Sequence, residues 1–194
     1  MDQSEQAIHS IIRGWIVEII SHRSDVVALA MAQRAKFEGW LKFELADAAR
    51  RNGAANIRVE PALSSGRADV GFDLAGTRCV VELKTPNTSD RMSGVENRSR
   101  PTTMNFASVV ADAEKLGRCG GGVIAFVLFP LKPGSARWLT HLERVSDGIG
   151  RPLIEDEHVA RQTIQLPDGA ADVAVVTFEV AGEQFQPVLR PTGA

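Results

Sequence analysis

Apolar residues recur at helical spacing along the first part of the chain. An apolar residue at every third or fourth position marks one face of a helix, and this spacing predicts a helix over residues 4–22. A second helix is expected from Ser24 to about Arg51, with Ser24 or Asp25 as its cap and Asn52-Gly53 as its end. The apolar positions of the first helix are Ile8, Ile11, Ile12, Trp15, Ile16 and Ile19.

Three short segments rich in β-forming residues follow, and helices and strands alternate after them. This order favours a mixed α/β fold in a single domain over residues 1–194, with an N-terminal helix (1–23), a core (24–130) and a C-terminal part (131–194). Further helices are expected over Thr103–Leu116 and Ser135–Val145. The expected strands are Ile57–Leu63, Ala68–Leu74, Arg78–Lys84, Val123–Phe129, His158–Leu166, Asp172–Val180 and Gln184–Leu189, the last three forming a C-terminal hairpin or meander.

Composition narrows the classes of function. The chain has 194 residues, of which 44% are hydrophobic and 24% charged, as in an ordinary globular domain. It has no apolar run long enough to span a membrane. Its polar, acidic start, Met1–Glu5, is unlike a secretory signal, so a cytoplasmic location is expected. The two cysteines form no disulfide framework. The formal charge of −2 means that any DNA contact must rest on a local cluster or on metal ions.

The strongest geometric inference concerns one hairpin. If Ala75-Gly76 is its tip, Phe72 faces Cys79 and Val70 faces Val81, which gives a coherent apolar side. The opposite side then places Asp69 opposite Glu82, and Arg67 opposite Lys84.

Two carboxylates opposed in this way lie roughly 4.5–5.5 Å apart at their Cβ atoms and repel each other. A divalent cation such as Mg²⁺ offsets that repulsion, and Lys84 points to the same side as Glu82. An ordinary solvated face with a salt bridge remains the alternative, because mixed charges are common on exposed sheets and Ala-Gly is a weak turn that permits a register shift.

Glu44 is a third acidic candidate. At about 100° per residue it falls inside the apolar stripe of the second expected helix, whereas Glu38 and Lys42 fall outside it. A carboxylate on a core-facing side needs a cation or hydrogen bonds. It either completes the metal site or pairs with a buried arginine such as Arg67 or Arg78. The stripe itself comprises Phe37, Trp40, Leu41, Leu45 and Ala48.

One spacing in the sequence resembles the motif of the PD-(D/E)XK nuclease superfamily, which has the restriction-endonuclease-like fold. It consists of Asp69, twelve intervening residues and then Glu82-Leu83-Lys84. The expected order of helix, three-strand meander, helix and strand is similar to that fold over about residues 24–130. The resemblance implies that Asp69 and Glu82 bind Mg²⁺ or Mn²⁺, that Lys84 positions water or stabilises the transition state, and that Glu44 supports the metal. Ala68 stands where the named motif has proline.

Other polar residues are weaker candidates. Arg91, Arg98 and Arg100 lie in a polar stretch of 17 residues, 85–101, and with Arg67 are candidates for contacts with nucleic-acid phosphates. Segments of this length are usually functional or disordered, although a solvated loop is an equal alternative. Asn105, Asp112 and Lys115 are candidates for the rim of the site, with a plain solvated helix face favoured. Zinc-site spacing, a phosphate-binding glycine loop and a serine-hydrolase elbow are all absent from the sequence.

The leading hypothesis is a metal-dependent nuclease that hydrolyses DNA phosphodiester bonds. The alternative is a catalytically inactive protein of the same fold that acts as a nucleic-acid-binding or protein-interaction module. A third hypothesis is that the resemblance to the PD-(D/E)XK superfamily is accidental and that the protein binds a small ligand. The C-terminal strands are candidates for supporting a homodimer, which suits cleavage of two strands.

Overall fold

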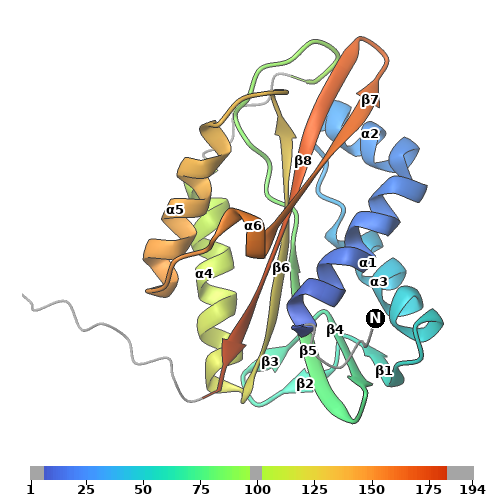
Figure 1. The fold of residues 1–194 in the computed structure, drawn as a ribbon, viewed down its shortest axis with the longest axis vertical. Helices are drawn as coiled ribbons and strands as arrows, with labels where there is room; N and C mark the ends of the chain where they lie inside the picture. The colour runs from blue at the N-terminus through green and yellow to red at the C-terminus, as the bar shows by residue number, and fades with distance from the viewer. Residues whose placement is uncertain (1–6, 97–101, 183–194) are drawn as a thin grey trace, which may run out of the picture.

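The computed structural model describes residues 7–96 and 102–182. Over these residues the chain forms six helices around a six-stranded mixed sheet in the order β1-β4-β5-β6-β8-β7, and a separate pair of short strands, β2 and β3 (Figure 1). The mixed α/β class is confirmed. The helices are α1 Ile8–His22, α2 Ser24–Gln33, α3 Glu38–Arg51, α4 Thr102–Arg118, α5 Arg137–Ile149 and α6 Glu155–His158. The strands are β1 Ala55–Val59, β2 Ala62–Leu63, β3 Gly66–Arg67, β4 Val70–Leu74, β5 Thr77–Lys84, β6 Gly121–Leu131, β7 Val159–Leu166 and β8 Gly169–Ala181.

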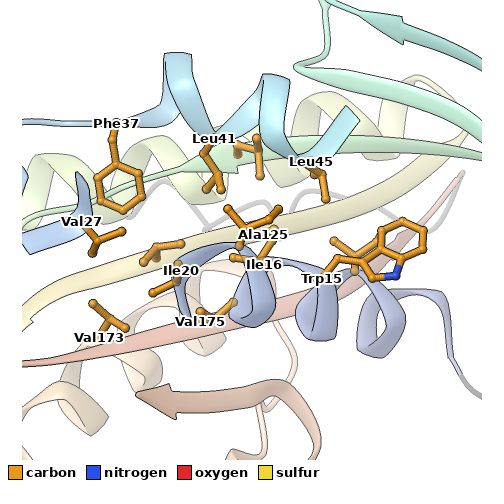
Figure 2. Close-up of a cluster of buried hydrophobic side chains, with 14 of the residues drawn as sticks. Trp15, Ile16, Ile20, Val27, Phe37, Leu41, Leu45, Ala125, Val173 and Val175 are labelled. Carbon is orange, nitrogen blue, oxygen red and sulfur yellow. The ribbon is translucent and has the colours of Figure 1, made fainter. Parts of the chain in front are cut away.

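Helices cover both faces of the sheet, with α1, α2 and α3 on one side and α4 and α5 on the other (Figure 1). Strand β6 supplies residues to both layers because its side chains alternate: Ala125 packs with α1–α3, and Phe126 with α4 and α5. Figure 2 shows the first layer, where Ile16 of α1 lies among the side chains of α3 and the sheet. The near-continuous apolar sequence of β6 is therefore explained by burial on both faces.

The long second helix expected from the sequence is broken in two. Gln33 ends α2, Glu38 begins α3, and Arg34 between them has a left-handed backbone with φ of 49°. The Arg34 guanidinium donates hydrogen bonds to the carbonyls of Thr88 (2.6 Å) and Glu96 (2.7 Å), and to that of Asp90. Contacts with a distant loop thus accompany the break, and helical periodicity alone does not reveal them.

The central hairpin has the expected register. Val70 pairs with Val81 and Phe72 with Cys79, and all four side chains are at most 4% exposed on the α1–α3 side. The turn at Ala75-Gly76 is also as expected, and both of its residues have positive φ. The sequence pattern therefore predicted this part of the sheet correctly.

The strand expected over Ile57–Leu63 is interrupted. Glu60 has a left-handed backbone with φ of 54°, and the following Pro61 has no N–H to donate to a ladder. The predicted opposition of Arg67 and Lys84 is wrong, because Arg67 pairs with Ala62 in the small β2–β3 ribbon while Lys84 pairs with Phe126 of β6.

The C-terminal strands extend the main sheet. Strand β8 runs antiparallel to both β6 and β7, and α1 packs against β8 and β6. Both chain ends of the described part thus share one core with the hairpin. The strand expected over 184–189 lies outside the described residues. Among the helices that the structure describes, none is long and apolar enough to cross a membrane.

Candidate functional site

Glu82 and Lys84 lie at the end of β5, on the face of the sheet that α4 covers. Strand geometry sends alternate side chains to opposite faces, so Leu83 between them packs into the α1–α3 core with no exposed surface. Glu82 is only 3% exposed. A carboxylate this deeply buried requires a cation or hydrogen-bond donors.

Helix α4 supplies the partners of both side chains. The Lys84 Nζ lies 2.7 Å from Oδ2 of Asp112, and the Lys115 Nζ forms an ion pair with Oε1 of Glu82. The Lys115 Nζ is also 3.8 Å from Oδ1 of Asp112 and donates a hydrogen bond of 2.9 Å to the carbonyl of Arg67. These contacts connect helix α4 to the end of β5 and to β3.

The favoured interpretation of Asp112 and Lys115 as a plain solvated face was therefore wrong. Their side chains are only 17% and 20% exposed because α4 lays this turn against the end of β5. Their three-residue spacing, which places opposite charges on one side of a helix, was the available signal in the sequence.

Asp69 precedes β4 and anchors the neighbouring strand. Its N–H donates to the carbonyl of Val81 (3.1 Å), and its Oδ2 accepts a hydrogen bond from the N–H of Leu83 (2.8 Å). The regular ladder ends at Val70 and Val81, so Asp69 and Glu82 are not the ladder pair that the sequence suggested. The charge of Asp69 nevertheless acts on both Glu82 and Lys84. We name Asp69, Glu82, Lys84, Asp112 and Lys115 the hairpin–α4 cluster.

Burial and the neighbouring charges shift the pKa of the two β5 side chains. Burial raises the pKa of Glu82 to about 7, with Asp112 and Asp69 adding to the rise and Lys115 opposing it. For Lys84, burial lowers the pKa, but the hydrogen bond and charge of Asp112 outweigh burial and hold the pKa above its ordinary value. Lys84 therefore stays cationic at neutral pH, whereas Glu82 gains or loses its proton close to neutral pH.

Glu44 does not have the surroundings expected of it. Its carboxylate accepts a hydrogen bond of 3.0 Å from Nε1 of Trp40 and lies 3.8 Å from Nη1 of Arg23, with its side chain 30% exposed. The alternative, pairing with an arginine, is confirmed in the kind of partner, but the arginine is Arg23 and not Arg67 or Arg78, and the pair is only partly buried. These neighbours place Glu44 with the α1–α2 junction and not with the hairpin–α4 cluster.

Glu38, which helical periodicity assigned to the surface, is the α3 carboxylate that reaches the end of β5. Its Oε1 accepts a hydrogen bond of 3.0 Å from the N–H of Thr85, and its charge helps to raise the pKa of Lys84. The break at Arg34 begins α3 at Glu38, so this residue lies in the first turn, next to the strand. No signal in the sequence identified that position.

Of the arginines proposed for phosphate contacts, the structure describes Arg67 and Arg91. Arg67 has a side chain that is 71% exposed and lies 3.4 Å from Oε2 of Glu60. Arg91 is exposed. Arg98 and Arg100 lie outside the described residues. The segment that carries Arg91 is bound through its backbone by Arg34, whose guanidinium donates to the carbonyls of Thr88, Asp90 and Glu96.

The cluster fits a divalent cation in the type of its donors. Asp69, Glu82 and Asp112 are hard oxygen donors of the kind that Mg²⁺ and Mn²⁺ prefer. Burial is the main cause of the raised pKa of Glu82, and the neighbouring charges of Asp112 and Asp69 add to it. No group of three acidic, histidine or cysteine side chains in residues 7–96 and 102–182 is arranged to hold a metal. The ammonium of Lys115 stands against Glu82 instead.

Comparison with known proteins gives no match to a family model, a curated protein or a solved structure. The relationship to the PD-(D/E)XK superfamily therefore remains a prediction from the spacing of Asp69, Glu82 and Lys84.

Proposed function

We propose that this chain is a metal-dependent nuclease that hydrolyses DNA phosphodiester bonds on a restriction-endonuclease-like core. One observation carries the proposal: Glu82 is only 3% exposed and lies two residues before Lys84 on the same side of β5. The negative charge of Asp69 also helps to raise the pKa of Glu82. Three carboxylates gathered at one position repel each other, and the two lysines of the cluster pair with only two of them, Glu82 and Asp112. The strand order and the helices on both faces are compatible with such a core.

In this proposal Asp69 and Glu82 hold Mg²⁺ or Mn²⁺, and Glu44 has no part. A metal ion held there would supply Lewis-acid stabilisation of the phosphate and would lower the pKa of an attacking water. Lys84 provides a fixed positive charge for the developing negative charge on the phosphate. Asp112 keeps that ammonium protonated and in place at 2.7 Å.

The test is cleavage by the purified chain of single-stranded, duplex, supercoiled and branched DNA, each with Mg²⁺, Mn²⁺ or EDTA. Lys84→Ala and Asp69→Asn are expected to lose activity by about a hundredfold or more. Lys132→Ala is the matched control, since Lys132 is exposed in the turn after β6. Cleavage that survives in EDTA or in both site variants contradicts the proposal.

A non-catalytic binding or interaction module of the same fold is the second candidate. It is favoured by the ion pairs of Glu82 with Lys115 and of Lys84 with Asp112, which already compensate these two carboxylates without a metal. DNA binding without cleavage under every metal condition, unchanged in Asp69→Asn, would support this function over the nuclease.

A further inference from the structure

Three oxygen atoms surround the ammonium of Lys115. Oε1 of Glu82 is its ion-pair partner, the carbonyl of Arg67 accepts a hydrogen bond of 2.9 Å, and Oδ1 of Asp112 lies 3.8 Å away. These oxygens come from β5, β3 and α4, so their meeting point is created by tertiary structure. The position holds one positive charge next to the most buried carboxylate of the cluster.

The Lys115 side chain is able to leave this position. It is 20% exposed, so it reaches solvent at one side, and a lysine has four flexible methylene groups between its backbone and its charge. Withdrawal to solvent removes no residue from either apolar core, since Lys115 belongs to neither. By contrast, Glu82 is fixed within a strand that is paired on both sides.

We propose that Lys115 is a built-in competitor for the divalent cation: its ammonium and the metal occupy the space beside Glu82 alternately. The inference rests on the proposed function, because it assumes that Glu82 is a metal ligand. The ammonium of Lys115 and a metal ion bound to the same carboxylate would lie close together and repel each other, and the single negative charge of Glu82 does not offset both. Metal binding therefore breaks the Lys115–Glu82 ion pair and the hydrogen bond from Lys115 to the carbonyl of Arg67. Without metal Lys115 lies beside Glu82, and with metal its side chain extends into solvent.

The first experiment measures Mn²⁺ binding by calorimetry or electron paramagnetic resonance, without DNA. Lys115→Gln is expected to lower the Kd for Mn²⁺ by about tenfold or more, as expected when a competing charge is removed. Lys132→Gln, which removes an exposed lysine elsewhere, is expected to leave the Kd unchanged. If the Kd of Lys115→Gln for Mn²⁺ is equal to or higher than that of the unmodified chain, the inference is overturned.

The second experiment uses the unmodified chain and so does not depend on how well a variant folds. An amine-reactive acylating reagent is applied with and without Mn²⁺, and the modification of each lysine is followed by mass spectrometry. Mn²⁺ is expected to raise the rate at Lys115 and to leave that at Lys132 unchanged. A rate at Lys115 that Mn²⁺ does not raise, in protein that binds Mn²⁺, overturns the inference.

The two failures are distinguishable. Equal Mn²⁺ binding by the unmodified chain and Lys115→Gln, together with metal-dependent DNA cleavage, rejects the competitor and leaves the nuclease intact. No Mn²⁺ binding by either protein rejects Glu82 as a metal ligand, and the competitor with it.

Discussion

The Nζ of Lys84 lies 2.7 Å from Oδ2 of Asp112, which joins the end of β5 to the middle of α4. The ion pair of Glu82 with Lys115 makes a second connection between the same two elements, one turn further along the helix. Helix α4 therefore determines the charge and the accessibility of the hairpin residues. The hairpin alone is only half of the candidate site.

Asp112→Asn is expected to lower the free energy of unfolding by about 1–3 kcal/mol, because a partly buried Lys84 loses its charged partner. The matched control is Asp147→Asn, at an exposed position of α5. Urea denaturation of both variants at neutral pH measures the difference. Equal stability of the two variants would show that the Lys84–Asp112 contact contributes nothing net.

Glu82 is expected to make the metal-free protein less stable as the pH rises. Its pKa in the folded chain is about 7, above the ordinary value of 4.5, so between these values the native state keeps a proton that the unfolded state has released. The free energy of unfolding therefore falls across this window, by about 3 kcal/mol for this group. Glu82→Gln removes that part of the slope. Denaturation curves in EDTA at several pH values measure it, and equal slopes in both proteins would contradict the assignment.

Arg34→Ala is expected to release the loop that leads away from Lys84. Its guanidinium bonds to the carbonyls of Thr88, Asp90 and Glu96, and a hydrogen bond to a charged group contributes about 1.5–3 kcal/mol. Amide hydrogen exchange across 88–96 is therefore expected to accelerate by more than about tenfold. Arg58→Ala, at an exposed position of β1, is the control. Unchanged exchange in Arg34→Ala would show that other contacts hold the loop.

Ala75→Asn is expected to stabilise the hairpin. Ala75 has φ of 48° and Gly76 has φ of 78°, a conformation in which asparagine followed by glycine is the preferred pair. The expected gain is about 0.5–1 kcal/mol, measured by thermal or urea denaturation. Ala75→Val is the opposite control, since a β-branched residue is strained at positive φ. If the two variants have equal stability, the turn conformation is not the one described.

Local spacing in the sequence was enough to predict the parts of the fold that depend on neighbours along the chain. The apolar period of α1 and the alternation in β4 and β5 predicted one helix and the register of the hairpin. Because the side chains of a strand alternate with a period of two, that register also put Asp69, Glu82 and Lys84 in one region. The deviation of Asp69 from the regular ladder lay beyond this reasoning, as did the hydrogen bond that its carboxylate accepts from the N–H of Leu83.

The tertiary structure decided which other charges belong with these three residues. The sequence favoured Glu44 over Glu38 and treated Asp112 and Lys115 as solvated, because helical periodicity shows only which residues share a side of a helix. It does not show whether the polar face of a helix is exposed to water or packs against a buried carboxylate. That outcome depends on how α3 and α4 dock against the sheet, and docking is set by packing among residues far apart in the chain.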